Sequence, residues 1–377
     1  MSSRTTHSPH AGVPACMRTI IASIVLLLVA GTSACSATRS KRPRAAPPSR
    51  ATSQAYPGFG FKTTGGAGRP TFTVTTLADS GAGSLRDALA KAARDGGTIR
   101  FAVGGGIQLE SGLDVPGRTT IDGSSAPVPG ITLWGAHTGA AGTGVVNLYE
   151  SNVVLRGLRI RDGKNDGVHI APRRRQAITN IVVDRCSITN SRDGGIDITG
   201  REDLPVTDVT ILANYIAGNG GPCEKGLCGG GSLANHGATR LSYYFNFWDK
   251  NLRRTPSVSG ADAVADVRDN VVRATVQGGI QIRDGARANL VDNTLEGPRG
   301  RTAAVELWDG RAHVDGTPSD VSSQSAIAAL PVPQVPPPRA AAVVMRDAGA
   351  LPRDALDTFF VETATTLEQL KARAANR

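Results

Sequence analysis

Hydrophobic positions recur along the middle of the chain at nearly equal spacing. Six segments share one pattern and cover residues 152–160, 180–188, 208–216, 240–248, 262–272 and 287–295. Their matching central positions are Leu158, Cys186, Asn214, Asn246, Asn270 and Asn293, separated by steps of 28, 28, 32, 24 and 23 residues. Each segment has apolar residues five and three positions before the centre and two positions after it. Alternation with period two is typical of strands, so the pattern predicts a strand that returns once per repeat.

Strands that return at this spacing predict an all-β fold, a parallel β-helix in which each coil packs on the next about 4.8 Å away. The four asparagines at the central position would form an internal ladder of amide hydrogen bonds. Cys186 occupies the same position, where a buried thiol acts as a small hydrophobe. Before the repeats, residues 83–94 have apolar side chains at helical spacing. We expect a short helix there that caps the open end of the solenoid.

Composition divides the chain into four parts. They are a leader at residues 1–35, a disordered linker at 36–55, the β-helix at 56–315, and a Pro-rich segment and tail at 316–377 that packs on or beside it. Residues 365–375 of the tail are a candidate terminal helix. Aromatic residues make up only 4% of the chain. The core must therefore be aliphatic, which suits a solenoid.

The leader predicts export. Met17 and Arg18 precede the apolar run 20–30, which is too short to span a membrane and is typical of a signal peptide that starts at Met17. The residues up to Cys35 resemble a bacterial lipoprotein cleavage site. The sequence leaves two outcomes open, simple secretion or a lipid anchor at Cys35, which would be the protein's only link to a membrane.

The formal net charge of +10 describes the leader and linker more than the folded part. Residues 1–50 contain seven Lys and Arg and no acidic residue, which leaves 35 basic against 32 acidic residues in the rest of the chain. This near-neutral balance and the sparse aromatics argue against a nucleic-acid partner. We expect a monomer.

Charged residues fall at nearly the same offset in successive repeats. The intervals are 27 residues from Asp166 to Asp193, 28 from Asp197 to Lys225 and 29 from Lys225 to Arg254. The predicted coils therefore gather three carboxylates and two cations on one lateral face, within roughly 15 Å of one another. Oxygen ligands clustered without His or Cys suit Ca²⁺. The alternative is that aspartates here only satisfy backbone amides in turns, and that Lys225 and Arg254 are ordinary surface charges.

Cys223 and Cys228 enclose four residues and are a candidate disulfide that would hold the loop carrying Lys225. The six histidines are scattered, and no His or Cys spacing supports a zinc site.

Several motifs resemble the pectate lyases of the family-one polysaccharide lyases, in the pectin lyase-like superfamily. They are residues 58–68 and 79–89, Val182-Val183-Asp184-Arg185, Lys225-Gly226, residues 238–248, and Arg254-Thr255-Pro256, with a fainter match at 348–357. This resemblance implies a right-handed β-helix that is secreted or surface-anchored and cleaves polygalacturonate, an acidic polysaccharide, by calcium-assisted β-elimination.

Carried over residue by residue, the resemblance makes Asp166, Asp193 and Asp197 the calcium ligands. It makes Lys225 a substrate-binding residue, and Arg254 both a substrate-binding residue and the base. Three positions depart from the family pattern and put efficiency and calcium affinity in question: Ser257 replaces a second arginine, Arg185 replaces a histidine, and Lys164 stands where some members have an aspartate.

Two other functions fit the same residues. A noncatalytic or weakly active β-helix could bind acidic cell-wall polysaccharide, which the changes at Ser257 and Arg185 favour. A glycoside hydrolase would need two carboxylates flanking the scissile bond, a role that Asp193 and Asp197 could fill.

Overall fold

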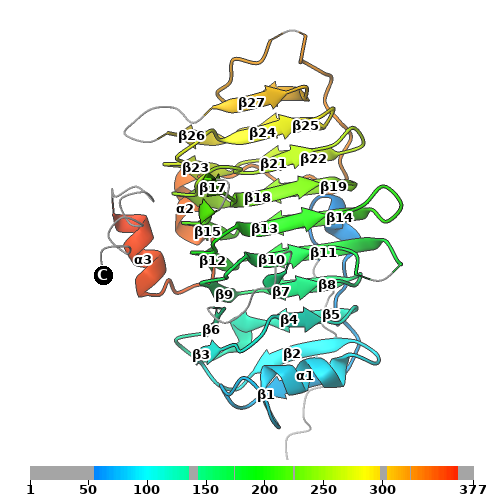
Figure 1. Cartoon of the computed structure of the whole chain (residues 1–377), viewed down its shortest axis with the longest axis vertical. Coiled ribbons are helices and arrows are strands. Elements are labelled where there is room, and N and C mark those ends of the chain that lie inside the picture. The colour runs from blue at the N-terminus through cyan, green and yellow to red at the C-terminus, as the bar shows by residue number, and fades with distance from the viewer. Residues whose placement is uncertain are drawn as a thin grey trace, which may run out of the picture. The chain divides into compact units, whose positions relative to one another are not determined.

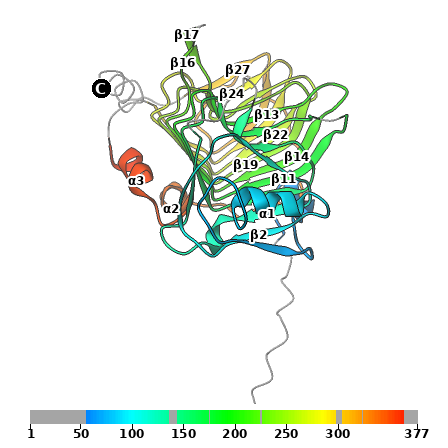
Figure 2. The same ribbon diagram turned by 60° about the horizontal axis from the view of Figure 1, so that its bottom comes forward.

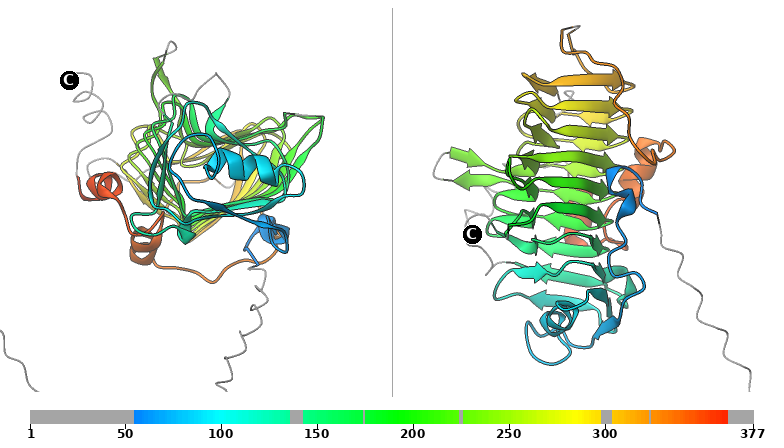
Figure 3. Two further views of the ribbon diagram at one scale, coloured as in Figure 1. Left: turned by 90° about the horizontal axis from the view of Figure 1, so that it is seen from below. Right: turned by 90° about the vertical axis from the view of Figure 1, so that its right-hand side faces the viewer.

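The computed structural model describes residues 55–135, 143–173, 175–223, 226–297, 304–322 and 324–363. Their chain winds into stacked coils that form three parallel sheets, as the hydrophobic repeat predicts (Figure 1). Viewed along the coil axis, the sheets enclose one core (Figure 3). No helix in the described part of the chain is long and apolar enough to cross a membrane.

Sheet A contains ten strands in coil order. These are β1 (Thr71–Val74), β2 (Gly97–Phe101), β5 (Thr119–Asp122), β8 (Val153–Arg156), β11 (Ile178–Asp184), β14 (Val206–Leu212), β19 (Ala238–Tyr244), β22 (Val264–Arg268), β25 (Arg287–Val291) and β28 (Arg311–Asp315). Residues pair in the register that the sequence repeat predicts, for example Val153 with Ile181 and Ile181 with Val209.

Sheets B and C contain eight strands each. Sheet B is β3 (Gly105–Gln108), β6 (Ile131–Trp134), β9 (Leu158–Arg161), β12 (Ser187–Thr189), β15 (Tyr215–Ala217), β20 (Phe247–Asp249), β23 (Val271–Arg273) and β26 (Thr294–Glu296). Sheet C is β4 (Leu113–Val115), β7 (Gly144–Leu148), β10 (Asp166–Ile170), β13 (Gly194–Thr199), β18 (Gly230–Asn235), β21 (Ser257–Ser259), β24 (Ile280–Arg283) and β27 (Val305–Trp308). A short antiparallel hairpin, β16 (Gly221–Cys223) and β17 (Gly226–Cys228), projects from the coils (Figure 2).

One residue in the left-handed conformation makes the sharp bend from sheet A to sheet B in six successive coils. The residues at this bend are Gly157, Arg185, Ala213, Phe245, Asp269 and Asp292, all with φ between 48° and 62°. Each stands directly before the central position of the repeat. A single left-handed residue turns the chain abruptly, so a strand of sheet A is followed almost at once by a strand of sheet B.

The residues just after the bend form the predicted amide ladder. The Asn214 Nδ2 donates to Asn246 Oδ1 at 3.0 Å, Asn246 to Asn270 at 3.0 Å and Asn270 to Asn293 at 2.9 Å. The Cys186 backbone N–H donates to Asn214 Oδ1, and Cys186 itself is a free, buried thiol. A second ladder, which the sequence pattern did not reveal, joins Asn219 Nδ2 to Asn251 Oδ1 at 3.0 Å.

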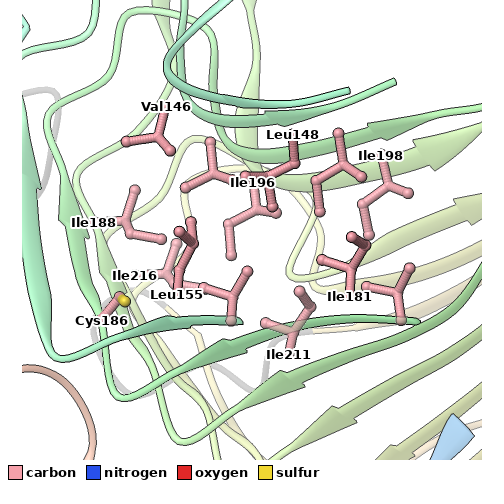
Figure 4. Close-up of a cluster of buried hydrophobic side chains, with 14 of the residues drawn as sticks. Val146, Leu148, Leu155, Ile181, Cys186, Ile188, Ile196, Ile198, Ile211 and Ile216 are labelled. Atoms are coloured by element: carbon pink, nitrogen blue, oxygen red, sulfur yellow. The ribbon is translucent and has the colours of Figure 1, made fainter. Parts of the chain in front are cut away.

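The core between the sheets is aliphatic. Isoleucine, leucine and valine side chains from successive coils stack on their equivalents, as Ile188 does on Ile216 and Ile196 on Val168 (Figure 4). Burial of such side chains is worth about 25 cal/mol per Å² of apolar surface, and each coil depends on its neighbours for it.

The first coils are covered by helix α1 (Leu85–Ala92), within the segment expected to form a cap. Ser84 caps its N-terminus by accepting from the Asp87 N–H, and its apolar side, with Leu85 and Leu89, is buried. A short 3₁₀ turn, η1 (Phe59–Lys62), packs against sheet A through hydrogen bonds from Phe59 and Gly60 N–H groups to Ser242 and Thr210. A second, η2 (Gly123–Ser125), follows β5.

After β28 the chain runs back along the outside of the coils. The Leu330 N–H donates to Asn289 Oδ1, and Gly58 N–H donates to the Gln334 carbonyl, so the Pro-rich segment lies over sheet A. Helices α2 (Ala341–Asp347) and α3 (Ala355–Glu362) then lie beside sheet B (Figure 1). These two helices were not expected from the sequence. The predicted helix at 365–375 lies outside the described residues, as do the leader and Cys35.

Candidate active site

Sheet C presents its outward side chains in two straight lines along the coil axis. The first line, read from strand pairing, is Asp114, Asn147, His169, Asp197, Leu233, Ser257, Gln281 and Glu306. Two residues further along each strand, the second line is Tyr149, Ala171, Thr199, Asn235, Ser259, Arg283 and Trp308. Most of these residues are polar or aromatic, whereas their neighbours along each strand belong to the core. Sheet C is therefore the face suited to bind a polar ligand.

Two carboxylates converge at the middle of this face. Asp166 opens β10 and accepts a hydrogen bond from the Gly194 N–H at 2.9 Å. Asp197, one coil further along on β13, accepts from the Leu233 N–H at 3.3 Å. A Cβ atom placed on Gly194 would lie 2.2 Å from Asp197 Oδ1 and 3.0 Å from Asp166 Oδ1. Both carboxylates therefore lie against the same glycine, and only a residue without a side chain fits between them.

Crowding and burial disfavour the ionised forms of both groups. Burial raises the pKa of Asp166 to about 7, and the negative charge of Asp193 adds to this, whereas the Gly194 hydrogen bond opposes it. Burial also raises the pKa of Asp197 well above its usual value, and the charges of Asp166 and Asp193 reinforce the effect. The three aspartates predicted to cluster do act on one another. A cation placed between them would relieve this repulsion.

His169 joins this cluster, although the sequence pattern did not predict a role for it. Its Nδ1 lies 3.1 Å from Asp166 Oδ2, and it pairs in register with Asp197 on the next coil. Burial lowers the pKa of His169, and the Asp197 charge opposes this shift. The sequence signal for His169 was its position three residues after Asp166. This spacing becomes informative only when the strand is known to begin at Asp166.

Arg254 is positioned by its backbone just before β21. It adopts the left-handed conformation with φ 58°, and its carbonyl accepts a hydrogen bond from the Ser232 N–H at 2.8 Å. Its positive charge opposes the raised pKa of both Asp166 and Asp197. The structure thus brings Arg254 within electrostatic reach of the carboxylates, as the spacing of the repeat predicts.

Arg253, next to it, holds the base of the projecting hairpin. Its guanidinium donates to the carbonyls of Gly229 at 3.3 Å and Leu227 at 3.2 Å. Burial and the charge of Arg254 lower the pKa of Arg253. Cys228 in this hairpin is disulfide-bonded. The side chain of Cys223 and all of Lys225 lie outside the described residues, so Cys223 stays the proposed partner and Lys225 a predicted site residue.

The three departures from the family pattern lie in different surroundings. Ser257 belongs to the first outward line beside Gln281, and its buried hydroxyl has no hydrogen-bond partner among the described residues. Lys164 is exposed in the turn before β10. Arg185 is at the bend from sheet A to sheet B and pairs with Asp184 at 2.8 Å. These contacts belong to a corner away from sheet C, and the effect of Arg185 on activity stays a prediction.

The donor set fits a hard cation held in an open site. In the described ranges no three His, Cys, Asp or Glu side chains converge closely enough to enclose a metal ion. Asp166 and Asp197 do converge, and they offer carboxylate oxygens of the kind that Ca²⁺ prefers. An ion bound there would need further oxygen ligands from Asp193, water or an acidic ligand.

Known proteins share this architecture. A family model described as right handed beta helix region matches residues 143–317. A probable pectate lyase C of Emericella nidulans is 34% identical over 221 residues, which are 57% of this chain and 46% of that protein. Another from Aspergillus fumigatus is 31% identical over 269 residues, 69% of this chain and 57% of that protein. The chain thus spans about half the length of the curated relatives it matches.

A solved structure extends the comparison to the fold. The pectate lyase Bsp165PelA from Bacillus sp. N165, in complex with trigalacturonate, superimposes with a TM-score of 0.55 at 14% identity over 78% of this chain and 98% of that one. The chain therefore has the right-handed parallel β-helix fold. Within that class its relatives are the pectate lyases, which confirms the resemblance found in the sequence motifs.

Proposed function

We propose that this protein is a polysaccharide lyase that cleaves polygalacturonate by β-elimination. The observation that carries the proposal is the placement of Arg254 beside the convergent pair Asp166 and Asp197, on a sheet face lined with polar residues. The similarity to pectate lyases over 221 to 269 residues supports the same reaction.

Arg254 is the proposed base. In the reaction it takes the proton from C5 of a uronate residue, the electrons of that C–H bond form the C4–C5 double bond, and the C4–O bond breaks. The leaving oxygen then takes a proton from solvent. Arginine is almost always protonated in proteins. Arg253 lies next to Arg254, and burial together with the charge of Arg254 lowers the pKa of Arg253, so two guanidinium groups are crowded at this site.

Calcium is the proposed cofactor. Asp166, Asp193 and Asp197 would hold the ion, and when bound it would neutralise a uronate carboxylate and make C5 more acidic. Lys225, which in the sequence falls between β16 and β17, is proposed to bind the same uronate. His169 orients Asp166 through the contact between its Nδ1 and the carboxylate.

One assay tests this function. Purified protein is mixed with polygalacturonate, with added Ca²⁺ or with chelator, and the ultraviolet absorbance of unsaturated uronides is followed. We expect the absorbance to rise with Ca²⁺ and to stay flat with chelator. A flat trace under both conditions, with binding detected by calorimetry, would identify a polysaccharide-binding protein instead. New reducing ends without unsaturated product, independent of Ca²⁺, would identify a hydrolase.

We also propose that the protein acts outside the cell, since its predicted signal peptide starts at Met17. Lipidation of Cys35 would distinguish a surface-anchored protein from one that is simply secreted. Metabolic labelling with a fatty acid analogue, comparing the natural sequence with Cys35→Ala, would label only the former if the lipid anchor exists. The two curated relatives reported above, from Emericella nidulans and Aspergillus fumigatus, are fungal and give no support to a bacterial anchor.

A further inference from the structure

Two aromatic side chains lie at opposite ends of the second outward line of sheet C. Tyr149 directly follows β7, and Trp308 ends β27. Six coil steps separate these two strands, which corresponds to about 29 Å at 4.8 Å per step. The residues between them in the line are small or polar, and each is partly accessible to solvent. The aromatic rings therefore bracket an accessible strip that runs beside the first line, which carries His169 and Asp197 of the candidate site.

Trp308 is 51% exposed, which is unusual for a large aromatic side chain in a folded domain. The guanidinium of Arg283, one coil closer to the site, lies over its ring at 4.9 Å from the ring centre. A cation stacked on an indole restrains the ring without covering both of its faces. Trp308 thus presents a fixed aromatic surface to solvent.

Arg283 connects this end of the line to the candidate site. Its charge contributes to the lowered pKa of Arg253, so the two guanidinium groups are within electrostatic reach of each other. The β24 strand that carries Arg283 is the next coil after β21, which Arg254 precedes. Arg253 thus interacts electrostatically with both Arg254 and Arg283, and Arg283 contacts the exposed tryptophan.

The opposite end of the line has the same composition. The guanidinium of Arg173 lies over the Tyr149 ring at 4.9 Å, and Tyr149 contacts His169 edge-to-face at 6.3 Å between ring centres. Tyr149 and Arg173 also line a hollow of about 400 Å³ between sheet C and helix α1. An arginine–aromatic pair thus stands at each end, and the convergent aspartates lie between them.

We propose that Trp308–Arg283 and Tyr149–Arg173 are the two outer binding positions for a polyuronate chain that lies along the second outward line. This proposal deepens the proposed function and rests on it. An aromatic ring stacks on the apolar C–H face of a sugar ring, and an arginine pairs with the carboxylate of a uronate. Each pair offers an aromatic face and a guanidinium, which together select an acidic sugar over a neutral one. Arg173 already pairs with Asp114, so a uronate carboxylate would share or replace that contact.

Because the two pairs lie far apart, the effect of each pair on binding should depend on the length of the substrate. A chain that covers both ends must extend about 29 Å, so a short oligouronide centred on Arg254 reaches neither or only one. Trp308 and Tyr149 therefore contribute to the binding of long substrates and contribute little to that of short ones.

The test is binding and turnover of oligogalacturonates of two to six residues and of polygalacturonate, measured for the full protein with Ca²⁺ present. Trp308→Ala and Tyr149→Ala should each raise the Kd for the hexamer and the KM for the polymer by about tenfold, the size expected for one lost stacking contact. The Kd for the dimer should change by less than about twofold. Trp308→Phe should retain most of the hexamer affinity, because it keeps an aromatic face.

Phe359→Ala is the matched control, since Phe359 is an exposed aromatic residue, 42% accessible, on α3 beside sheet B. It should leave every Kd unchanged. Thermal melting of each variant checks the fold, which the loss of the exposed Trp308 side chain should leave intact. If the natural protein binds the hexamer and both alanine variants bind it equally well, the outer positions are wrong while the proposed function stands. If the natural protein binds no polygalacturonate, the proposed function fails and this inference fails with it.

Discussion

Asn246 lies at the middle of the internal amide ladder and makes hydrogen bonds in both directions. Its Oδ1 accepts from Asn214 Nδ2 at 3.0 Å, and its Nδ2 donates to the Ile211 carbonyl at 2.8 Å and to Asn270 Oδ1 at 3.0 Å. Asn246 is fully buried. Removing its amide would leave several buried polar groups without partners, each of which costs about 1–3 kcal/mol.

We therefore expect Asn246→Ala to lower the free energy of unfolding by about 3 kcal/mol or more. Denaturant titration followed by circular dichroism measures this change. Gln108→Ala is the control, because it removes a similar amide from an exposed position on β3 and should cost less than about 0.5 kcal/mol. Equal unfolding midpoints for the two variants would contradict a stabilising role for the ladder.

Arg254 allows an equally specific prediction about turnover. Arg254→Ala should reduce kcat on polygalacturonate by about 10²–10⁴-fold, the range expected for the loss of a general base. Arg240→Ala is a close control, since Arg240 also has a left-handed backbone, with φ 55°, but lies on sheet A. It should retain full kcat. Normal turnover by the Arg254 variant would show that another group takes the proton.

Some residues of the site could be predicted from the sequence and others could not. The spacing of the repeat brought Asp166, Asp193, Asp197 and Arg254 to one face, because a charge that recurs once per coil stays on the same side. His169 escaped this prediction because the matching positions in the neighbouring coils are Asn147 and Asp197, so no histidine recurs once per coil. The second asparagine ladder also escaped, since only two coils contribute to it.

Strand β13 shows how an element depends on one small residue at its start. The backbone at Gly194 is not in the left-handed region that favours glycine, so an alanine is compatible with it. The added Cβ would nevertheless lie 2.2 Å from Asp197 Oδ1 and displace that carboxylate. The glycine is needed for the arrangement of the two aspartates, not for the strand itself.

Gly194→Ala should therefore weaken Ca²⁺ binding by about tenfold or more, by moving one ligand, while the thermal melting temperature of the chelated protein changes little. Isothermal titration calorimetry with Ca²⁺ alone measures the affinity. Gly106→Ala on β3 is the control, because its Cβ would meet only the Trp134 side chain, far along the coil from the site. Unchanged Ca²⁺ affinity in the Gly194 variant would argue against the assigned ligands.

At the level of elements, the sequence predicts best what depends on local pattern. Residues 83–94 contain α1, which begins at Leu85 and ends at Ala92, because an apolar face and a serine cap act within a few residues. Helices α2 and α3 carry weaker patterns. They are held by partners distant in the chain, such as Arg161 with Asp357, which are 196 residues apart, and such contacts leave no local signal.

The molecule as a whole is closed on one side by its C-terminal segment. Arg161 Nη2 pairs with Asp357 Oδ1 at 2.8 Å with both side chains fully buried, and with Asp354 Oδ2 at 3.2 Å. Lys250, also buried, pairs with Asp249 at 3.0 Å and donates to the Phe360 carbonyl. Breaking a buried ion pair by removing one partner typically costs 3–5 kcal/mol, because the other charge stays buried.

Asp357→Ala should therefore release α3 from sheet B, at a cost of about 3 kcal/mol, because Asp354 still shares Arg161. Hydrogen exchange measured by mass spectrometry should show loss of protection at α3, with the strands of sheet C unaffected. Asp347→Ala removes a more exposed carboxylate paired with Arg346 and should change nothing. Full protection of α3 in the Asp357 variant would show that apolar contacts alone hold it.

The two outward lines of sheet C follow from the constant rise of the coil, and this has a consequence for how such proteins diversify. Duplicating one complete turn between β21 and β27 would move Trp308 about 4.8 Å away from Arg254 and alter the chemistry of neither. The length of polymer that sheet C can contact would then change in steps of one coil. A gene that gains or loses whole turns could thus vary the length of chain it grips while its reactive centre is inherited intact.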